Sequence, residues 1–286
     1  MKKQTKYRTR LPRSGSINGK SPVLNFELSA SGKTDVGLKR LRNEDAFYCD
    51  TEKQLFIVCD GLGGMSAGDR ASAASIEAIS RCLIADRMNK LARSADQLTQ
   101  AKLRESLVTA NHALIQIVQE HPECDGMGST AIIAMIEGET AHIANIGDSR
   151  GYLIRNGIIG QLTRDDSVAW ELIEAGQISA TDARGHKLRN RLTACLGHVE
   201  DVLNDGLYIR LRAGDTLLLC TDGLWEPVAD EEIVSIVCGA ESTEQAVDHL
   251  AEAANRAGGP DNITAVVISI SKCTGMQLAT ANLKAS

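Results

Sequence analysis

Hydrophobic positions divide the chain into short continuous apolar runs and longer stretches in which apolar residues recur at helical spacing. An unbroken run of four to six apolar residues is typical of a strand buried on both faces. The spacing of Ala74, Ile76, Ile79 and Leu83 instead indicates one face of a helix. We predict strands at residues 55–59, 131–136, 141–146, 152–154, 158–162, 217–220 and 262–270, and helices at residues 69–84, 94–119, 229–238 and 243–257.

Turn residues show how these elements connect. Glu137-Gly138 and Asn156-Gly157 each separate two neighbouring predicted strands. Asn and Gly both tolerate positive φ, so Asn156-Gly157 is a strong hairpin signal. The strands cluster in hairpins and the helices come in consecutive pairs between those clusters, a pattern that favours an α+β fold over a doubly wound parallel sheet.

Composition narrows the class of protein. The 286 residues are 43% hydrophobic and 24% charged, as expected of a globular protein, and only 3% are aromatic, so the core has to be aliphatic. No apolar run is long enough to span a membrane, and no apolar segment follows the basic start as in a secretory signal. The net charge of −6 argues against nucleic-acid binding. The eight cysteines form no C-x-x-C pair, which argues against a zinc knuckle and fits a reducing, cytoplasmic setting.

The two ends differ from the middle. Residues 1–25 are rich in Lys and Arg and contain no acidic residue, since the first is Glu27. We interpret them as a flexible basic tail, residues 26–271 as one folded domain, and residues 272–286 as a loose C-terminal tail.

Three aspartates share one setting. Asp60 and Asp222 directly follow predicted buried strands, and Asp261 directly precedes another. If these strand ends converge, the carboxylates repel one another unless a cation lies between them. Oxygen ligands favour Mg²⁺ or Mn²⁺ over Zn²⁺. Each Asp also has a glycine close by, and Asp-Gly is a common turn former. The spacing alone therefore does not decide whether these aspartates are turn residues or metal ligands.

The wider pattern decides between them, because it resembles the metal-dependent, type 2C protein serine/threonine phosphatases (the PPM family) over nearly all of residues 29–270. Residues 37–45 resemble the motif G-x-x-R-x-x-N-E-D, and residues 60–64 resemble D-G-M-G-G. Further matching segments follow in family order at residues 126–130, 145–150, 162–167, 190–197, 221–225 and 259–264.

The resemblance implies a four-layer α-β-β-α sandwich, with two central antiparallel sheets flanked by helices. It also implies a centre of two Mn²⁺ or Mg²⁺ ions. Asp60 would bridge both ions and the Gly61 carbonyl would bind one, while Asp222 and Asp261 would complete the other. Glu44 and Asp45 would hold coordinated waters. A third ion in related enzymes implicates the Asp before the G-M-G motif, which here is Asp125.

The implied reaction is hydrolysis of phosphoserine and phosphothreonine on proteins by a metal-activated water, with no phosphoenzyme intermediate. Arg40 would grip the phosphate through its planar fork of donors. The implied partners are phosphorylated proteins, among them a bacterial-type serine/threonine kinase and its targets. We expect a monomer without nucleic-acid or membrane partners.

The chain departs from the family pattern at three positions. Leu62 stands where some relatives carry a histidine general acid, Asp166 where His is usual, and Ala194 where Arg is common. Two alternative functions stay open. One is a phosphatase that acts on anti-sigma-factor antagonists, although such enzymes usually carry sensor domains. The other is an inactive phosphoprotein-binding protein, against which the filled ligand positions argue.

Overall fold

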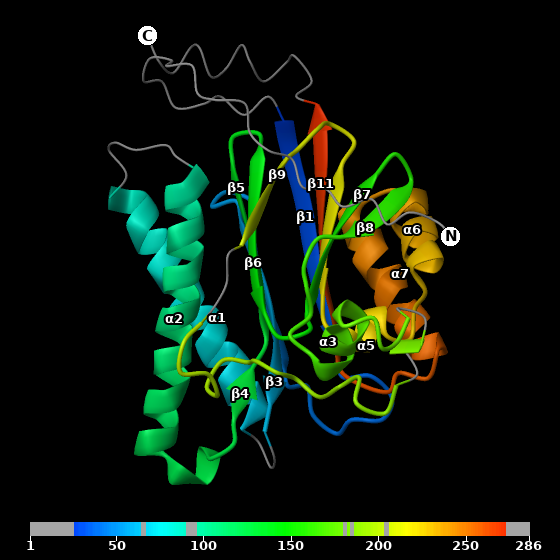
Figure 1. The fold of residues 1–286 in the computed structure, drawn as a ribbon. Coiled ribbons are helices and arrows are strands. Elements are labelled where there is room, and N and C mark those ends of the chain that lie inside the picture. Colours follow the sequence, from blue (N-terminus) through cyan, green and yellow to red (C-terminus); the bar gives the residue numbers. More distant parts are fainter. Residues whose placement is uncertain are drawn as a thin grey trace.

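Two antiparallel sheets lie face to face in the computed structural model, which describes residues 26–63, 67–89, 96–179, 182–183, 186–202 and 206–272 (Figure 1). The first sheet has the strand order β1 (Phe26–Asp35), β11 (Ile263–Lys272), β10 (Thr216–Cys220), β7 (Arg150–Arg155), β8 (Ile158–Gln161). The second has the order β2 (Asp45–Asp50), β3 (Leu55–Leu62), β5 (Ala131–Glu137), β6 (Thr140–Ile146), β9 (Leu207–Arg210), and the short β4 (Gly128–Ser129) pairs with the end of β3. Every pairing is antiparallel.

The continuous apolar runs arise because both faces of these strands are buried. In β3, Phe56 and Val58 pack between the sheets, whereas Leu55, Ile57 and Cys59 face the helices of the second sheet. Strands β5, β10 and β11 alternate in the same way. Successive side chains of a strand point to opposite faces, so each apolar run contributes residues to two hydrophobic cores.

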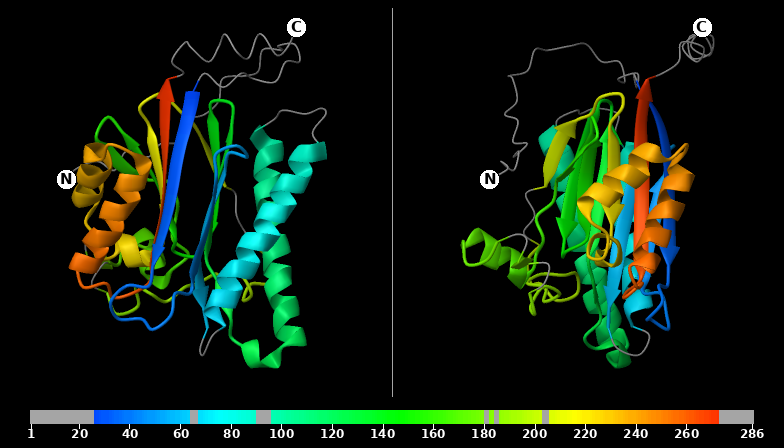
Figure 2. Two further views of the ribbon diagram at one scale, coloured as in Figure 1. Left: turned by 180° about the vertical axis from the view of Figure 1, so that it is seen from behind. Right: turned by 90° about the vertical axis from the view of Figure 1, so that its right-hand side faces the viewer.

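Helices cover the outer face of each sheet (Figures 1 and 2). The long α1 (Gly68–Asn89) and α2 (Asp96–Glu120) pack on the second sheet. The short α5 (Asp222–Trp225), α6 (Asp230–Gly239) and α7 (Thr243–Arg256) pack on the first. The structure confirms the predicted α-β-β-α sandwich. Within the described ranges, no helix is long and apolar enough to cross a membrane.

The sequence pattern missed several short or half-exposed elements. These are β1, β2, β4, β9, the helix α3 (Val168–Glu174), α5 and the 3₁₀ helix η2 (Pro122–Cys124). The predicted basic tail, and the C-terminal tail beyond Lys272, lie outside the described residues.

The first and last strands close the domain. β1 pairs with β11 over its whole length, from Phe26 opposite Lys272 to Asp35 opposite Ile263. The end of β10 also pairs with the start of β11, since Cys220 lies opposite Ala265. The chain segments that carry Asp222 and Asp261 therefore meet at one end of the first sheet.

Candidate metal centre

The predicted ligands converge at one end of the sandwich and come from both sheets. Asp60 lies in β3 directly opposite Asp45 of β2. Asp222 begins α5 after β10, and Asp261 lies two residues before β11. The carboxylates of Asp45, Asp222 and Asp261 each raise the pKa of Asp60, so the four side chains share one electrostatic environment.

Burial and mutual repulsion raise the pKa of four carboxyl groups here, those of Asp45, Asp60, Asp148 and Asp222. Burial is the largest cause of the raised pKa of Asp60, followed by the charge of Asp45. Burial also raises the pKa of Asp222 well above its ordinary value, with the charges of Asp148 and Asp261 adding to it. Burial raises the pKa of Asp45 to about 7 and that of Asp148 to about 7. Such a cluster is costly to keep charged without a cation.

Two carboxylate oxygens in this cluster have no hydrogen-bond partner. Both Asp45 Oδ1 and Asp222 Oδ1 are buried and unsatisfied. The other oxygen of Asp45 accepts hydrogen bonds from Thr221 Oγ1 (2.9 Å) and Thr264 Oγ1 (2.7 Å), which tie β2 to the first sheet. Buried polar atoms are nearly always paired in folded proteins, so these two oxygens fit a missing ligand.

Arg40 reaches the cluster from the loop between β1 and β2. Its Nη2 donates to Asp261 Oδ2 at 2.7 Å, and its side chain is half exposed. The structure thus brings Arg40 to a predicted metal ligand. As the side chains stand, no three His, Cys, Asp or Glu residues in the described ranges form a group that could hold a metal ion.

Close backbone packing surrounds the aspartates. The amide of Gly61 donates to the carbonyl of Glu44 at 3.1 Å, and a Cβ at Gly61 would lie 2.0 Å from the Gly68 carbonyl oxygen. A Cβ at Gly223 would lie 1.8 Å from the Asn262 carbonyl oxygen. These two glycines are required because any side chain would push apart the segments that carry the carboxylates.

Glu44 and Asp125 lie at the margin of this arrangement. Glu44 is partly exposed, and burial is the largest cause of its raised pKa. Asp125 is exposed at the end of η2, three residues before β4, where Gly128 pairs with Leu62 at the end of β3. Asp125 therefore lies near this end of β3 but lines a different hollow, of about 190 Å³, with Met127 and His198.

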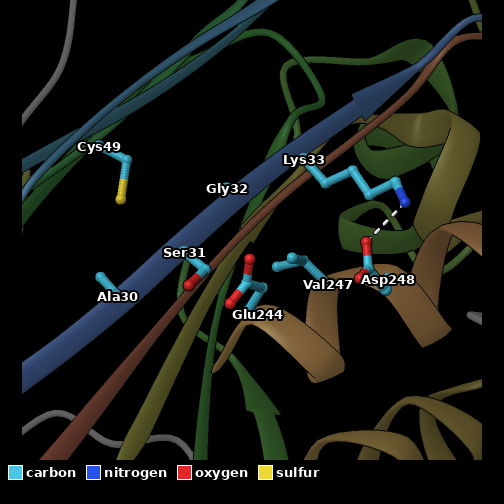
Figure 3. Close-up of a pocket in the computed structure, with 8 residues that line it drawn as sticks. All are labelled: Ala30, Ser31, Gly32, Lys33, Cys49, Glu244, Val247 and Asp248. Carbon is cyan, nitrogen blue, oxygen red and sulfur yellow. Dashed lines mark hydrogen bonds and ion pairs between the residues drawn. The ribbon is translucent and has the colours of Figure 1, made fainter. Parts of the chain in front are cut away.

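A second hollow, of about 440 Å³, lies between β1 and α7 (Figure 3). Its lining includes Lys33, whose Nζ donates to Asp248 Oδ1 at 2.6 Å, together with Cys49 and Glu244. None of the predicted site residues lines it, so the candidate chemistry does not lie there.

Sequence reasoning gave Asn262 no role, yet its side chain positions the loop that carries Arg40. Its Nδ2 donates to the carbonyl oxygens of Val36 and Arg42, both at 2.9 Å. Its Oδ1 accepts from the Glu44 amide at 2.8 Å. The sequence did mark Asn262, because it directly follows Asp261 in a segment that matches the family. Its hydrogen-bond partners could not be predicted, because they lie more than two hundred residues away in the chain.

We expect Asn262→Ala to destabilise the protein by about 2–4 kcal/mol, because three hydrogen bonds of about 1 kcal/mol each are lost and buried partners are left unpaired. Chemical denaturation of the metal-free protein measures this change. Asn190→Ala, at an exposed loop position, is the control and should change stability by less than about 0.5 kcal/mol. Equal stability of the two variants would contradict the role given to Asn262.

Asp148 and Asp166 also acquire roles. Asp148 contributes to the raised pKa of both Asp60 and Asp222, and its backbone carbonyl accepts from Trp225 Nε1 at 3.1 Å. Asp166, which stands where relatives usually carry His, accepts at Oδ2 from the Gly147 amide at 3.0 Å. It therefore braces the loop that presents Asp148.

Comparisons with known proteins identify the relatives of this arrangement. The family profile for protein phosphatase 2C matches residues 32–172. The chain is 37% identical over 245 residues to the serine/threonine protein phosphatase PstP of Mycobacterium tuberculosis, covering 85% of this chain but only 45% of PstP. It is 34% identical to the serine/threonine phosphatase stp of Listeria monocytogenes, with 84% of this chain and 95% of that protein covered.

Solved structures agree with the sequence comparisons. The serine/threonine phosphatase Stp1 from Staphylococcus aureus superposes with a TM-score of 0.79 at 33% identity, covering 89% of this chain and all of that one. The catalytic domain of PstP in complex with two manganese ions superposes with a TM-score of 0.75 at 32% identity, covering 86% and 99% of the two chains.

Proposed function

Because this chain belongs to the protein phosphatase 2C family, we propose that it hydrolyses phosphoserine and phosphothreonine in proteins, using divalent cations held by its aspartate cluster. The observation that carries the proposal is the cluster itself. Four carboxyl groups from two sheets converge with raised pKa values, and two of their buried oxygens have no partner. The named phosphatase relatives then indicate which reaction such a cluster serves.

The donor set fits Mn²⁺ or Mg²⁺, because all its atoms are oxygens. We propose Asp60, Asp222, Asp261 and the Gly61 carbonyl as direct ligands for two ions, with Glu44 and Asp45 holding waters and Asp125 serving a third ion. The solved PstP complex with two manganese ions supports a centre of two ions. When bound, such ions lower the pKa of a water and neutralise charge on phosphoryl oxygens.

Arg40 serves the substrate in this proposal. Its guanidinium pairs with Asp261 at 2.7 Å, which places it beside the proposed metal ligands. From there its paired donors would bind the substrate phosphate. Leu62 is aliphatic and cannot donate a proton to the leaving group. That proton therefore has to come from water or from another group.

Metal dependence is the direct test. We expect turnover of a phosphothreonine peptide with Mn²⁺, loss of turnover with EDTA, and recovery when Mn²⁺ is restored. Each bound Mn²⁺, at about 100 times its Kd, adds about 2.7 kcal/mol of stability, which raises the melting temperature by about 5–10 °C per ion. Turnover that resists EDTA would overturn the metal assignment. A lack of turnover with every divalent ion would overturn the proposal that this chain is a phosphatase.

We further propose that the substrates include a serine/threonine kinase and its targets, and that the protein acts as a cytoplasmic monomer. Relatives named serine/threonine phosphatases support phosphoserine and phosphothreonine, the products of such kinases, as the substrates. A comparison of phosphoproteins in cells with and without the protein tests it, because substrates accumulate in the phosphorylated form when the enzyme is missing. Light scattering of the purified chain tests the monomer.

A further inference from the structure

Exposed apolar side chains gather beside the proposed site. Among the described residues, four large hydrophobic side chains are exposed, and three of them, Val36, Leu38 and Leu41, lie between β1 and β2. Leu41 is 100% exposed and Leu38 is 64% exposed. We call residues 36–42 the apolar loop. It runs across the same end of the sandwich as β4 and α5 (Figure 1). Gathered apolar side chains on a surface commonly mark a binding site.

The apolar loop is held firmly in place. The Leu38 amide donates to the Gly259 carbonyl at 2.9 Å, and the Gly37 amide donates to Asp35 Oδ1 at 2.8 Å. Asn262 holds the carbonyls at both ends of the loop. The leucines are therefore presented to solvent by a fixed backbone, and a ligand that covers them loses little ordering entropy to the loop.

Charge on the same loop indicates what covers it. Lys39, Arg40 and Arg42 are exposed between and beside the leucines, and Arg40 turns to Asp261 in the metal centre. An occupant of this surface thus lies next to the centre, with cations around its apolar contact. A phosphorylated, acidic segment of a protein matches both features.

We propose that the apolar loop is the substrate-docking surface of this phosphatase. It binds the segment around the phosphorylated residue and prefers an apolar side chain next to that residue, with an acidic residue beyond. This inference rests on the proposed function. Leu38 and Leu41 cover the apolar side chain, Lys39 and Arg42 pair with the acidic one, and Arg40 reaches the phosphate.

The test compares three substrates and two variants. The substrates are a phosphothreonine peptide with Leu beside the phosphoresidue, the same peptide with Ser there, and p-nitrophenyl phosphate, which is too small to reach the loop. The variant Leu38→Ser/Leu41→Ser is expected to lose about 10-fold in kcat/KM on the Leu peptide, from partial loss of leucine burial, and little on the other two substrates. Fluorescence anisotropy of the labelled Leu peptide should show a similar loss of affinity without requiring turnover.

Ile158→Ser is the matched control, because Ile158 is the fourth exposed large hydrophobic residue, at 66% exposure. It begins β8 and pairs with Arg155 at the end of β7. This end of β7 lies next to Thr216, at the start of β10, whereas the metal centre lies beyond Cys220, at the other end of β10. This variant should match wild type throughout.

Several results would overturn the inference. One is equal use of both peptides by wild type, with no change in the double variant. Another is an equal loss on all three substrates, which indicates a structural role. A third is that the double variant binds the peptide as wild type does but no longer binds phosphatidylserine vesicles. That result would show that the loop binds membranes. If wild type turns over none of the substrates, the proposed function fails, and peptide anisotropy still decides whether the loop docks phosphopeptides.

Discussion

Asp222→Asn is expected to lower kcat/KM on a phosphothreonine peptide by at least about 100-fold, while the metal-free protein becomes no less stable than wild type. Even the outer partners of metal ligands typically contribute 10–100-fold, so loss of a proposed direct ligand should exceed that range. Stability behaves differently, because Asp222 is a buried carboxyl whose pKa is raised well above its ordinary value and whose Oδ1 has no partner. Asn removes a charge that the metal-free fold bears at a cost.

The pH dependence of stability tests the same cluster without turnover. Asp45 and Asp148 have pKa values of about 7 in the folded chain, against about 3.9 for an unfolded Asp. The folded state therefore binds more protons than the unfolded state between these values. With EDTA present, this cluster should make stability fall as pH rises from about 4 to about 7. The fall should be smaller in Asp222→Asn, because the raised pKa of Asp222 itself no longer contributes to it.

Asp248→Asn is the control, since Asp248 forms a surface ion pair with Lys33. It should keep full activity and change stability by less than about 1 kcal/mol. Near-normal turnover by Asp222→Asn with saturating Mn²⁺ would remove Asp222 from the metal centre. A clear loss of metal-free stability in that variant would instead mean that Asp222 is a structural residue.

Arg150→Met is expected to destabilise the fold by about 3–5 kcal/mol, because it leaves Asp165 buried without its cation. Arg150 donates to both oxygens of Asp165, at 2.6 Å for the shortest contact, and the two side chains are 13% and 5% exposed. Its guanidinium also lies 3.4 Å from the centroid of the Trp225 ring, next to the segment that carries Asp222. At 2–4 °C per kcal/mol for a domain of this size, we expect a melting temperature about 6–20 °C lower.

The matched comparison is Arg210→Met, which breaks an ion pair with Glu139 at the surface, where the Arg210 side chain is 81% exposed. Differential scanning calorimetry on both variants should show a change of less than about 1 kcal/mol for Arg210→Met. Similar melting temperatures for the two variants would show that the buried pair contributes no more than an exposed one.

The sequence predicted those parts of the fold that follow from local pattern. Strand β3 was readable because both of its faces are buried, so every position from Leu55 to Cys59 is apolar. Strand β1 was not, because its half-exposed edge position admits Ser31, Gly32 and Lys33, which break the alternation. Helix α5 has four residues, which is too short for any helical period to appear.

The site divides in the same way. Asp60, Asp222 and Asp261 could be proposed because their strand-end setting and surrounding motifs are local, and the structure brings them together. Their assignment as ligands stays a prediction. The contacts of Asn262 could not be predicted from the sequence, because its partners lie in a loop that only the folded sandwich places beside it. The pairing of Arg40 with Asp261 likewise joins residues from opposite ends of the domain.

The pairing of β1 with β11 sets when the proposed metal centre can assemble during synthesis. Asp60 and Arg40 leave the ribosome early, but Asp261 and the strand that supports it are made near the end of the domain. Until residues 261–272 have emerged from the exit tunnel, β1 lacks β11, its neighbour in the first sheet among the described strands, and the centre lacks one of its carboxylates. A nascent chain is therefore expected to stay inactive towards phosphoproteins until all of residues 26–272 have been made.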